Sequence, residues 1–300
     1  MITILGPTAT GKTSLAAHLA NLINGEIISA DSRQVYRGMD IGTGKDIDDY
    51  FVADKKIPYH LIDIVDPGYE YNVFEFQKDF LKAYTAIDEK GSIPILCGGT
   101  GLYIESVLKG YKLINVPKDE ELRQALELKE DTELIEMLSS YKNLHNTTDT
   151  SERERLIRAI EIQKYYDENL DIDTSFPNIE TKIFGIQFDR RVVKMRITER
   201  LEERLQNGMI EEVQGLLNAG VKPEQLTFYG LEYKWVTDFL EEKIAYNEMF
   251  RRLNTAIHQF SKRQMTWFRR MEKQGFEINW IDGNLSLEEK IAFILKNLPK

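Results

Sequence analysis

The strongest indication of the fold is the stretch Gly6-Pro7-Thr8-Ala9-Thr10-Gly11-Lys12-Thr13 (GPTATGKT, residues 6–13). An apolar run, Ile2 to Leu5, precedes it and an amphipathic run, Ser14 to Leu22, follows it, which predicts a strand, a glycine-rich turn and a helix. The spacing G-x-x-x-x-G-K-T is that of the phosphate-binding loop, in which backbone N–H groups and the N-terminal end of the helix surround an anion. Lys12 adds a positive charge, and the Thr13 hydroxyl is placed to bind magnesium. The motif therefore predicts an oligophosphate ligand, and a chance match in this context has odds below roughly one in ten.

The composition is typical of a soluble globular protein. The 300 residues suffice for one or two domains, and 42% of them are hydrophobic. No apolar run approaches the roughly 20 residues of a membrane span, and the chain begins almost directly with a strand, so we expect a cytoplasmic monomer without a signal peptide. The single Cys97 excludes an intrachain disulfide and is expected in a buried strand. Because the formal charge is −10, a nucleic-acid partner needs a locally basic face.

Strand and helix patterns alternate along the first part of the chain. Further strands are expected at Glu26 to Ala30, Tyr59 to Val65 and Ile93 to Cys97, with helices at Ser14 to Asn24, Asn72 to Lys90 and Leu102 to Lys109. This alternation predicts an α/β fold, a doubly wound parallel sheet of the P-loop NTPase type flanked by helices. The long polar connection 31–58 is of a kind that is more often functional than merely structural.

The character of the sequence changes near Pro117. Residues 118–180 are charged and mostly helical in pattern, with a polar turn at Asn143 to Asp149, and predict a small helical insertion domain. Thr181 to Phe188 returns to a strand pattern. We therefore expect a core domain made of residues 1–117 and 181–300.

One long helix is expected from Arg190 to Leu217, with apolar residues every four positions facing a core: Ile197, Leu201, Leu205, Met209 and Val213. Arg196, Arg200 and Arg204 repeat with the same spacing, next to this apolar stripe. They could reach into a crevice, where the guanidinium fork suits phosphate oxygens. Alternatively they form a solvated row paired with the acids at positions 199, 202 and 203.

A second helix, expected from Glu248 to Met271, has the opposite charge from the chain as a whole. Residues 249–275 contain seven Lys and Arg and one acid, interleaved with Phe260, Trp267 and Phe268. Cations with aromatic rings suit single-stranded nucleic acid, through phosphate contacts and base stacking. The alternative is a core helix with buried aromatic residues and solvated charges, and composition does not separate the two.

Asp31 follows the predicted strand Glu26 to Ala30. In doubly wound sheets the ligand crevice lies outside the carboxyl ends of the strands, so this carboxylate is expected near the bound phosphates. It could bind magnesium through water or act as a general base on a neighbouring substrate. The alternative is a turn or helix cap, because Asp is common at strand ends.

Several blocks of sequence, in this order along nearly the whole chain, resemble the tRNA dimethylallyltransferase (tRNA isopentenyltransferase) family. They are GPTATGKT (6–13), SADSRQVYRGMDIGTGK (29–45), HLIDIVDP (60–67) with YNVFEFQKDF (71–80), GGTGLY (98–103), ERLIRAIEI (154–162), the helix from Asp189 to Glu212 and KRQMTWFR (262–269). The phosphate loop alone is shared with many nucleotide-binding proteins, whereas the 29–45 and 262–269 blocks are far more specific. Two segments depart from the family pattern: Asp46 stands where the family usually has Pro, and 230–233 reads Gly-Leu-Glu-Tyr in place of Gly-Tyr-Lys/Arg-Glu/Gln.

The resemblance implies transfer of a dimethylallyl group from dimethylallyl pyrophosphate to N6 of the adenosine next to the anticodon, with Mg²⁺ as cofactor. By this likeness Asp31 is the base, Arg200 binds phosphate and Thr100 lies near the target nucleotide. The pyrophosphate would be held by Gly6, Thr8, Thr10, Gly11, Lys12 and Thr13, with Thr13 on the metal. The tRNA anticodon stem-loop would be contacted by Ser32, Arg33, Gln34, Arg123, Arg155, Arg158, Lys262, Arg263, Gln264, Trp267 and Arg269.

Three other functions are compatible with parts of the sequence. A P-loop kinase of a small metabolite or nucleotide would need an acid on a core strand to hold magnesium, and Asp63 could serve. A non-catalytic RNA-binding protein would use the basic helix with a degenerate loop, but the loop keeps its Gly, Lys and Thr residues. A prenyltransferase acting on free nucleotide would leave the basic helix without a purpose.

Overall fold

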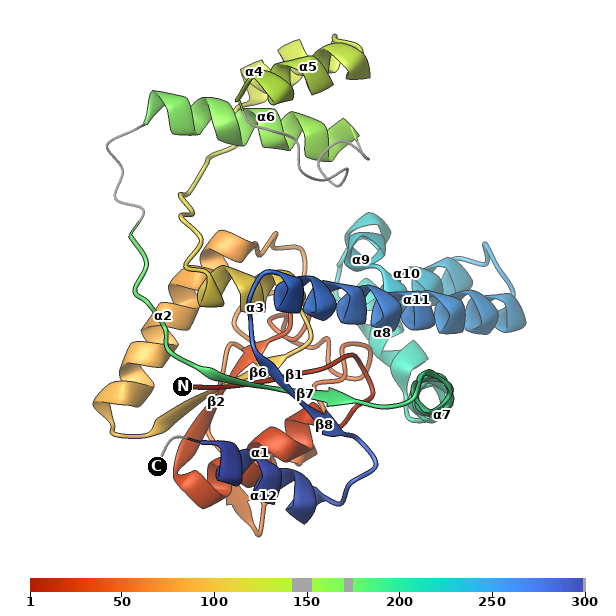
Figure 1. Ribbon diagram of the computed structural model, residues 1–300. Coiled ribbons are helices and arrows are strands. Elements are labelled where there is room, and N and C mark those ends of the chain that lie inside the picture. Colours follow the sequence, from red (N-terminus) through yellow and green to blue (C-terminus); the bar gives the residue numbers. More distant parts are fainter. Residues whose placement is uncertain (142–152, 170–174, 299–300) are drawn as a thin grey trace. The chain divides into compact units, whose positions relative to one another are not determined.

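The computed structural model describes residues 1–141, 153–169 and 175–298. Its centre is a six-stranded sheet in the order β5-β2-β6-β1-β7-β8, in which every pairing is parallel (Figure 1). The strands are Ile2–Leu5 (β1), Gly25–Ala30 (β2), Tyr59–His60 (β5), Ile93–Gly98 (β6), Lys182–Gln187 (β7) and Ile278–Asp282 (β8); Phe51–Val52 (β3) and Lys55–Lys56 (β4) form a separate antiparallel pair. The predicted α/β fold, a parallel sheet flanked by helices, is confirmed.

Helices cover both faces of the sheet, so the central strands are buried throughout, as parallel strands require. All four residues of β1 and all six of β2 are buried. Helices α1 and α12 lie on one face, and α2 and α3 lie on the other (Figure 1). The helices of this part are Lys12–Ile23 (α1), Val73–Glu89 (α2), Gly101–Leu108 (α3), Arg190–Gln206 (α7), Met209–Asn218 (α8), Pro223–Tyr229 (α9), Leu231–Leu240 (α10), Tyr246–Lys273 (α11) and Leu287–Asn297 (α12), with a 3-10 turn at Ile47–Tyr50 (η1).

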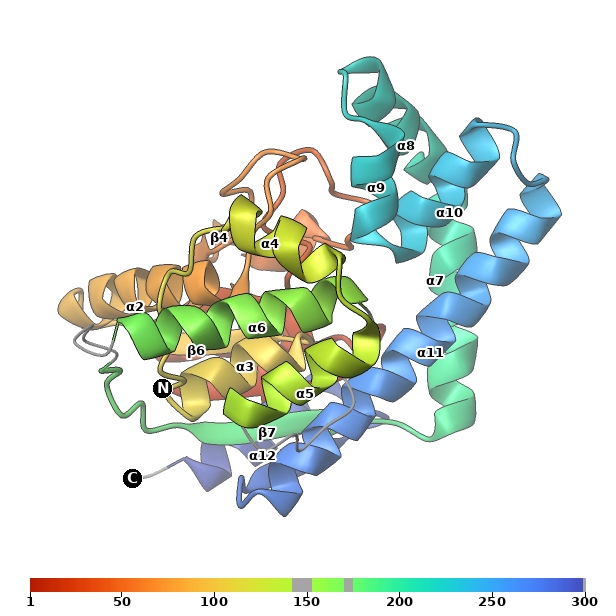
Figure 2. The same ribbon diagram turned by 90° about the horizontal axis from the view of Figure 1, so that it is seen from above.

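Two of the apolar cores in the described part of the chain bear on the position of the site. One joins the sheet to α1 and α12, through residues such as Ile4, Leu19 and Ile294. The other joins α7 to α11 and includes Ile197, Leu201, Met209 and Val213, four of the five residues predicted to face a core. Helices α7 and α11 contact each other directly, which Figure 2 shows from above. The second core therefore holds α7, with its row of arginines, next to the basic helix α11.

The chain divides into two compact units, one of residues 1–110 and 177–300 and one of residues 111–176. The smaller unit contains Glu120–Glu127 (α4), Asp131–Tyr141 (α5) and Arg153–Glu168 (α6) around a core of leucine and isoleucine side chains. The polar turn predicted at Asn143 to Asp149 lies outside the described residues. The expectation of an insertion domain spanning residues 118–180 stays a prediction. None of the helices in the described ranges is long and apolar enough to cross a membrane.

Two predicted elements differ from the structure. The single helix expected from Arg190 to Leu217 is two helices, because Gly208 adopts a left-handed conformation (φ 99°) that ends α7 and begins α8. The strand expected from Tyr59 to Val65 stops after His60. Leu61 and Asp63 have φ values of 63° and 56°, which an extended strand cannot contain.

Candidate functional site

The phosphate loop joins β1 to α1 and is fixed by its own hydrogen bonds. The Thr10 hydroxyl donates to the Pro7 carbonyl at 2.8 Å, and Lys12 Nζ lies 3.4 Å from the same oxygen. Gly11 has a φ of 76°, which permits the sharp entry into α1. Burial lowers the pKa of Lys12, while the nearby Cys97 and Asp31 act in the opposite direction. In the described structure the Lys12 ammonium group has one hydrogen-bond partner, the Pro7 carbonyl, so it can also bind an anion at the start of α1.

Asp31 lies directly after β2, at the carboxyl edge of the sheet. One of its oxygens, Oδ1, accepts a hydrogen bond from the Arg33 amide at 2.9 Å, which is the turn cap named above as the alternative to a functional role. Thr100, which follows β6, accepts from the Ser32 amide at 3.0 Å through Oγ1. Since β6 lies between β1 and β2, these contacts bring the Asp31 turn and the Thr100 turn together next to the phosphate loop.

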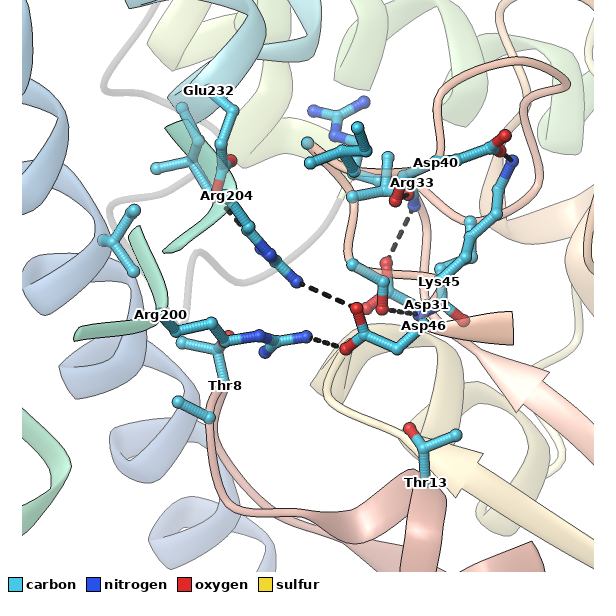
Figure 3. A pocket seen from close by; sticks show the side chains of 18 of the residues that line it. Thr8, Thr13, Asp31, Arg33, Asp40, Lys45, Asp46, Arg200, Arg204 and Glu232 are labelled. Atoms are coloured by element: carbon cyan, nitrogen blue, oxygen red, sulfur yellow. Dashed lines mark hydrogen bonds and ion pairs between the residues drawn. The ribbon is translucent and has the colours of Figure 1, made fainter. Parts of the chain in front are cut away.

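The arginine row on α7 reaches into the same region. Arg196 Nε donates to the Ala9 carbonyl of the phosphate loop at 2.8 Å. Arg200 forms an ion pair with Asp46, and Arg204 lies 3.7 Å from the other Asp46 oxygen (Figure 3). Of the two interpretations of this row, the structure therefore favours the one in which the arginines reach into a crevice.

Arg204 and the acidic residue beside it are both largely buried, and burial shifts the pKa of each. Its side chain is 13% exposed and its Nη1 lies 3.9 Å from the Glu232 carboxylate. Burial and the neighbouring Arg200 lower the pKa of Arg204, and burial raises the pKa of Glu232 in spite of the guanidinium beside it. Asp46 and Glu232, which both belong to the segments that depart from the family pattern, thus supply the carboxylates that face this arginine.

These groups line one cavity of about 1120 Å³. The cavity wall includes twelve of the predicted site residues: Thr8, Thr10, Gly11, Lys12, Thr13, Asp31, Ser32, Arg33, Gln34, Arg200, Arg263 and Gln264. Gly6, Thr100, Lys262, Trp267 and Arg269 are not among the residues that line it. The structure therefore brings the predicted base, the phosphate loop and the predicted phosphate-binding arginine to one place.

Two glutamines that we predicted to contact tRNA have another role in the structure. Gln264 is 6% exposed; its Oε1 accepts from the Thr8 amide and its Nε2 donates to the Gly99 carbonyl, both at 2.9 Å. Gln34 is 7% exposed and is hydrogen-bonded to the Ser29 hydroxyl and the Gly44 carbonyl. A contact of either side chain with RNA stays a prediction, and it would have to share or replace these internal hydrogen bonds.

The basic helix α11 combines both interpretations offered by its composition. Phe268 is fully buried, while Lys262, Arg263 and Arg269 are exposed. The Trp267 ring packs against Gly101. The Arg270 guanidinium lies over this ring, with its Cζ atom 3.9 Å from the ring centroid. One face of the helix thus builds the core while the other presents cations.

The arginines predicted in the smaller unit are engaged with a buried acid. Arg123 donates to both oxygens of Glu161 at 2.9 Å, and Arg158 pairs with the same carboxylate. Burial alone raises the pKa of Glu161, but these hydrogen bonds outweigh it and lower the pKa to about 2. Arg155, on the same helix, is exposed. A tRNA contact by Arg123 or Arg158 would compete with this ion pair.

Sequence reasoning missed two residues that shape the wall of the cavity. Lys45 is fully buried, and its Nζ bonds to the Tyr36 carbonyl and to the carboxylates of Asp40 and Asp63. Glu212 on α8 accepts from three successive amides, at residues 40, 41 and 42, at 2.6 to 3.0 Å. Together they fix the loop that carries Asp46. No local sequence signal reveals either role, since both depend on distant partners.

The cavity wall also offers hard oxygen donors suited to magnesium. Thr13, Asp31 and Asp49 all line it, although no group of three or more His, Cys, Asp or Glu side chains in the described ranges is arranged to hold a metal on its own. Mg²⁺ commonly takes one or two protein oxygens together with phosphates and water. These residues therefore fit a magnesium ion that arrives with a phosphate ligand.

Known proteins resemble this chain along its whole length. A family model described as IPP transferase matches residues 34–271, and one described as isopentenyl transferase matches residues 1–61. A "tRNA dimethylallyltransferase 2" of Bacteroides fragilis is 57% identical over 300 residues, covering 100% of this chain and 98% of that protein. One from Phocaeicola vulgatus is 55% identical over 298 residues, covering 99% and 97%.

Solved structures agree with these relatives. A full-length tRNA isopentenylpyrophosphate transferase from Bacillus halodurans is 32% identical, with a TM-score of 0.71 over 98% of this chain and 94% of that one. A eukaryotic dimethylallyltransferase crystallised while acting on tRNA shares the fold, with a TM-score of 0.78 at 21% identity over 100% of this chain and 80% of that one. The resemblance in the sequence motifs is thus confirmed, and the chain belongs to the IPP transferase family.

Proposed function

We propose that this chain transfers a dimethylallyl group from dimethylallyl pyrophosphate to N6 of the adenosine next to the anticodon of tRNA, and releases pyrophosphate. The observation that carries the proposal is that Asp31 lines the same cavity as Lys12 and Arg200. A carboxylate and a phosphate-binding site that line one cavity suit the transfer of an alkyl group between a base-activated amine and a pyrophosphate.

The proposed chemistry assigns a role to each of these groups. N6 of adenine is a weak nucleophile because its lone pair is delocalised into the ring. As N6 attacks C1 of the dimethylallyl group, the C1–O bond breaks, the electron pair leaves with pyrophosphate, and a proton on N6 passes to the free Asp31 oxygen. Lys12, Arg200 and the N-terminal end of α1 stabilise the charge that develops on the leaving group.

Magnesium fits the pyrophosphate side of the cavity. We propose that Thr13 holds it, with Asp49, which lines the same cavity, as a further oxygen donor. When bound there, Mg²⁺ would supply positive charge to the leaving pyrophosphate. Burial, reinforced by Asp46, raises the pKa of Asp49, so a nearby cation would also favour its ionised form.

The tRNA is proposed to approach along α11. Arg263 on this helix lines the cavity, and Lys262 and Arg269 are exposed beside it. The target base has to leave the stack of the anticodon loop to reach Asp31. Ser32 and Arg33, next to the base, and Trp267 on α11 remain predicted contacts. We propose that the chain does this as a monomer in the cytoplasm.

The kinase alternative loses its key residue in the structure. Asp63, the acid that could have held magnesium, is paired with the buried Lys45 and does not line the cavity. A purely RNA-binding role would not explain the intact phosphate loop or the presence of Asp31 in the same cavity.

Mass spectrometry of adenosine from tRNA incubated with the protein and dimethylallyl pyrophosphate tests the proposal. We expect a prenylated adenosine at the position next to the anticodon, and an anticodon stem-loop should serve as acceptor where AMP does not. Robust hydrolysis of ATP without prenyl transfer would support the kinase instead. Prenylation of AMP but not of the stem-loop would indicate the free-nucleotide enzyme.

A further inference from the structure

Arg200, the arginine proposed to bind the donor, already has an anionic partner. It forms an ion pair with Asp46, and both side chains line the cavity, with exposed fractions of 28% and 44% (Figure 3). Building on the proposed function, we infer that Asp46 is an internal competitor for Arg200. Its carboxylate occupies the arginine when the site is empty, and donor or product pyrophosphate must displace it.

The backbone holds Asp46 in position for this role. Lys45, the preceding residue, is anchored in the interior by its three oxygen partners. Gly44 approaches the arginine row so closely that a Cβ atom there would lie 1.8 Å from Arg204 Nη2. Asp46 itself has a left-handed backbone (φ 41°), an uncommon conformation for a residue other than glycine. The carboxylate therefore points at the arginines because the loop before it is fixed.

The second arginine makes the competition stronger. Arg204 Nη2 is buried and, within the described part of the chain, has no hydrogen-bond partner, although it lies 3.7 Å from Asp46. Acidic and basic side chains thus alternate along the series Glu232, Arg204, Asp46 and Arg200, and their formal charges add up to zero. Pyrophosphate adds several negative charges next to Asp46, and its binding is opposed by that carboxylate as long as Asp46 stays on Arg200.

The position of Asp46 at the cavity surface makes displacement feasible. Its side chain is nearly half exposed, and exposed ion pairs are individually weak, so its removal from Arg200 costs little compared with breaking a buried pair. After the reaction, Asp46 can return to Arg200 as pyrophosphate leaves. The residue thereby lowers the affinity for product as well as for donor.

Calorimetric titration of inorganic pyrophosphate, in the presence of Mg²⁺, into the full-length protein tests this inference. Asp46→Asn removes the competing charge, and Asp46→Gly does the same while suiting the left-handed backbone. Asp48→Asn is the matched control, because Asp48 lines the same cavity but makes no ion pair in the described structure. We expect both Asp46 variants to bind pyrophosphate about tenfold tighter than wild type, and the control to change by no more than about twofold.

The inference is overturned if the Asp46 variants bind pyrophosphate no more tightly than Asp48→Asn, or if they bind it more weakly than wild type. Failure of the proposed function gives a different result. In that case wild type prenylates no adenosine in the stem-loop assay, whatever the titrations show. Prenyl transfer by wild type together with unchanged binding in both Asp46 variants rejects the competition alone.

Discussion

Replacing Glu161 by Gln tests whether the arginines of the smaller unit hold that unit together. Glu161 lies on α6 with a side chain only 2% exposed. Its carboxylate accepts from Arg123 at 2.9 Å, from the Asp119 amide at 2.7 Å and from Arg158. The glutamine has nearly the same shape but no charge, so the substitution removes the anion from a buried site that contains two cations.

The size of the effect follows from the pKa of Glu161. Burial acts to raise it, but the hydrogen bonds lower it from 4.5 to about 2. A difference of roughly 2.5 units corresponds to about 3 kcal/mol of stability. Because the pKa is lowered by folding, this contribution is fully present above pH about 4.5 and is lost as the pH falls towards about 2. Breaking a buried ion pair typically costs about 3–5 kcal/mol, which agrees.

Urea unfolding followed by far-ultraviolet circular dichroism measures the loss, at pH 7 and in steps down to about pH 3. Glu168→Gln is the control, because Glu168 lies on the same helix and, among the residues that the structure describes, forms its one ion pair with Lys164, at 3.9 Å and with both side chains exposed. We expect Glu161→Gln to lower the free energy of unfolding by about 3 kcal/mol at pH 7 and the control by less than about 1 kcal/mol. The difference between wild type and Glu161→Gln should shrink below pH about 4.5. A difference that is independent of pH, or equal to that of the control, would refute the reasoning.

Three further predictions concern the proposed reaction. Asp31→Ala should abolish prenyl transfer to a stem-loop while its binding in a filter assay persists; a wild-type rate would remove Asp31 as the base. Neutralising Lys262 and Arg263 should reduce the slope of log affinity for tRNA against log salt by roughly 0.7 per lost phosphate contact, and an unchanged slope would place the RNA elsewhere. Gln264→Leu leaves the Thr8 amide and the Gly99 carbonyl without their partner, so we expect the KM for dimethylallyl pyrophosphate to rise about tenfold. Gln259→Leu, on the exposed side of α11, is the control and should match wild type. Equal KM values in the two variants would show that Gln264 does not position the phosphate loop.

Patterns that depend on neighbours in the sequence predicted the fold well. The apolar run before residues 6–13 is β1, and the amphipathic run after it is α1. Cys97 is buried in β6, as expected, and burial raises its pKa to about 12. The long helix failed at Gly208 because helical periodicity continues through a single left-handed residue without a visible break.

Side-chain roles could be predicted only in part. The spacing of Arg196, Arg200 and Arg204 indicated a row but not what the row faces. Gln34 and Gln264 belong to motifs that suggested RNA contact, yet burial commits their amides to the protein. A polar residue in a motif gives no indication of its exposure, which is set by the packing of the helix or loop that carries it.

The phosphate loop can be predicted from local sequence, because its strand, glycine turn and helix start lie within about a dozen consecutive residues. The surroundings of that loop depend on tertiary packing. Gln264 reaches Thr8 across 256 positions, and Arg200 meets Asp46 across 154. Such contacts depend on which face α7 and α11 turn towards the sheet, and that rotation is fixed by the shared apolar core. The loop therefore predicts a phosphate ligand, whereas the packing of distant helices supplies the charges that compete for it.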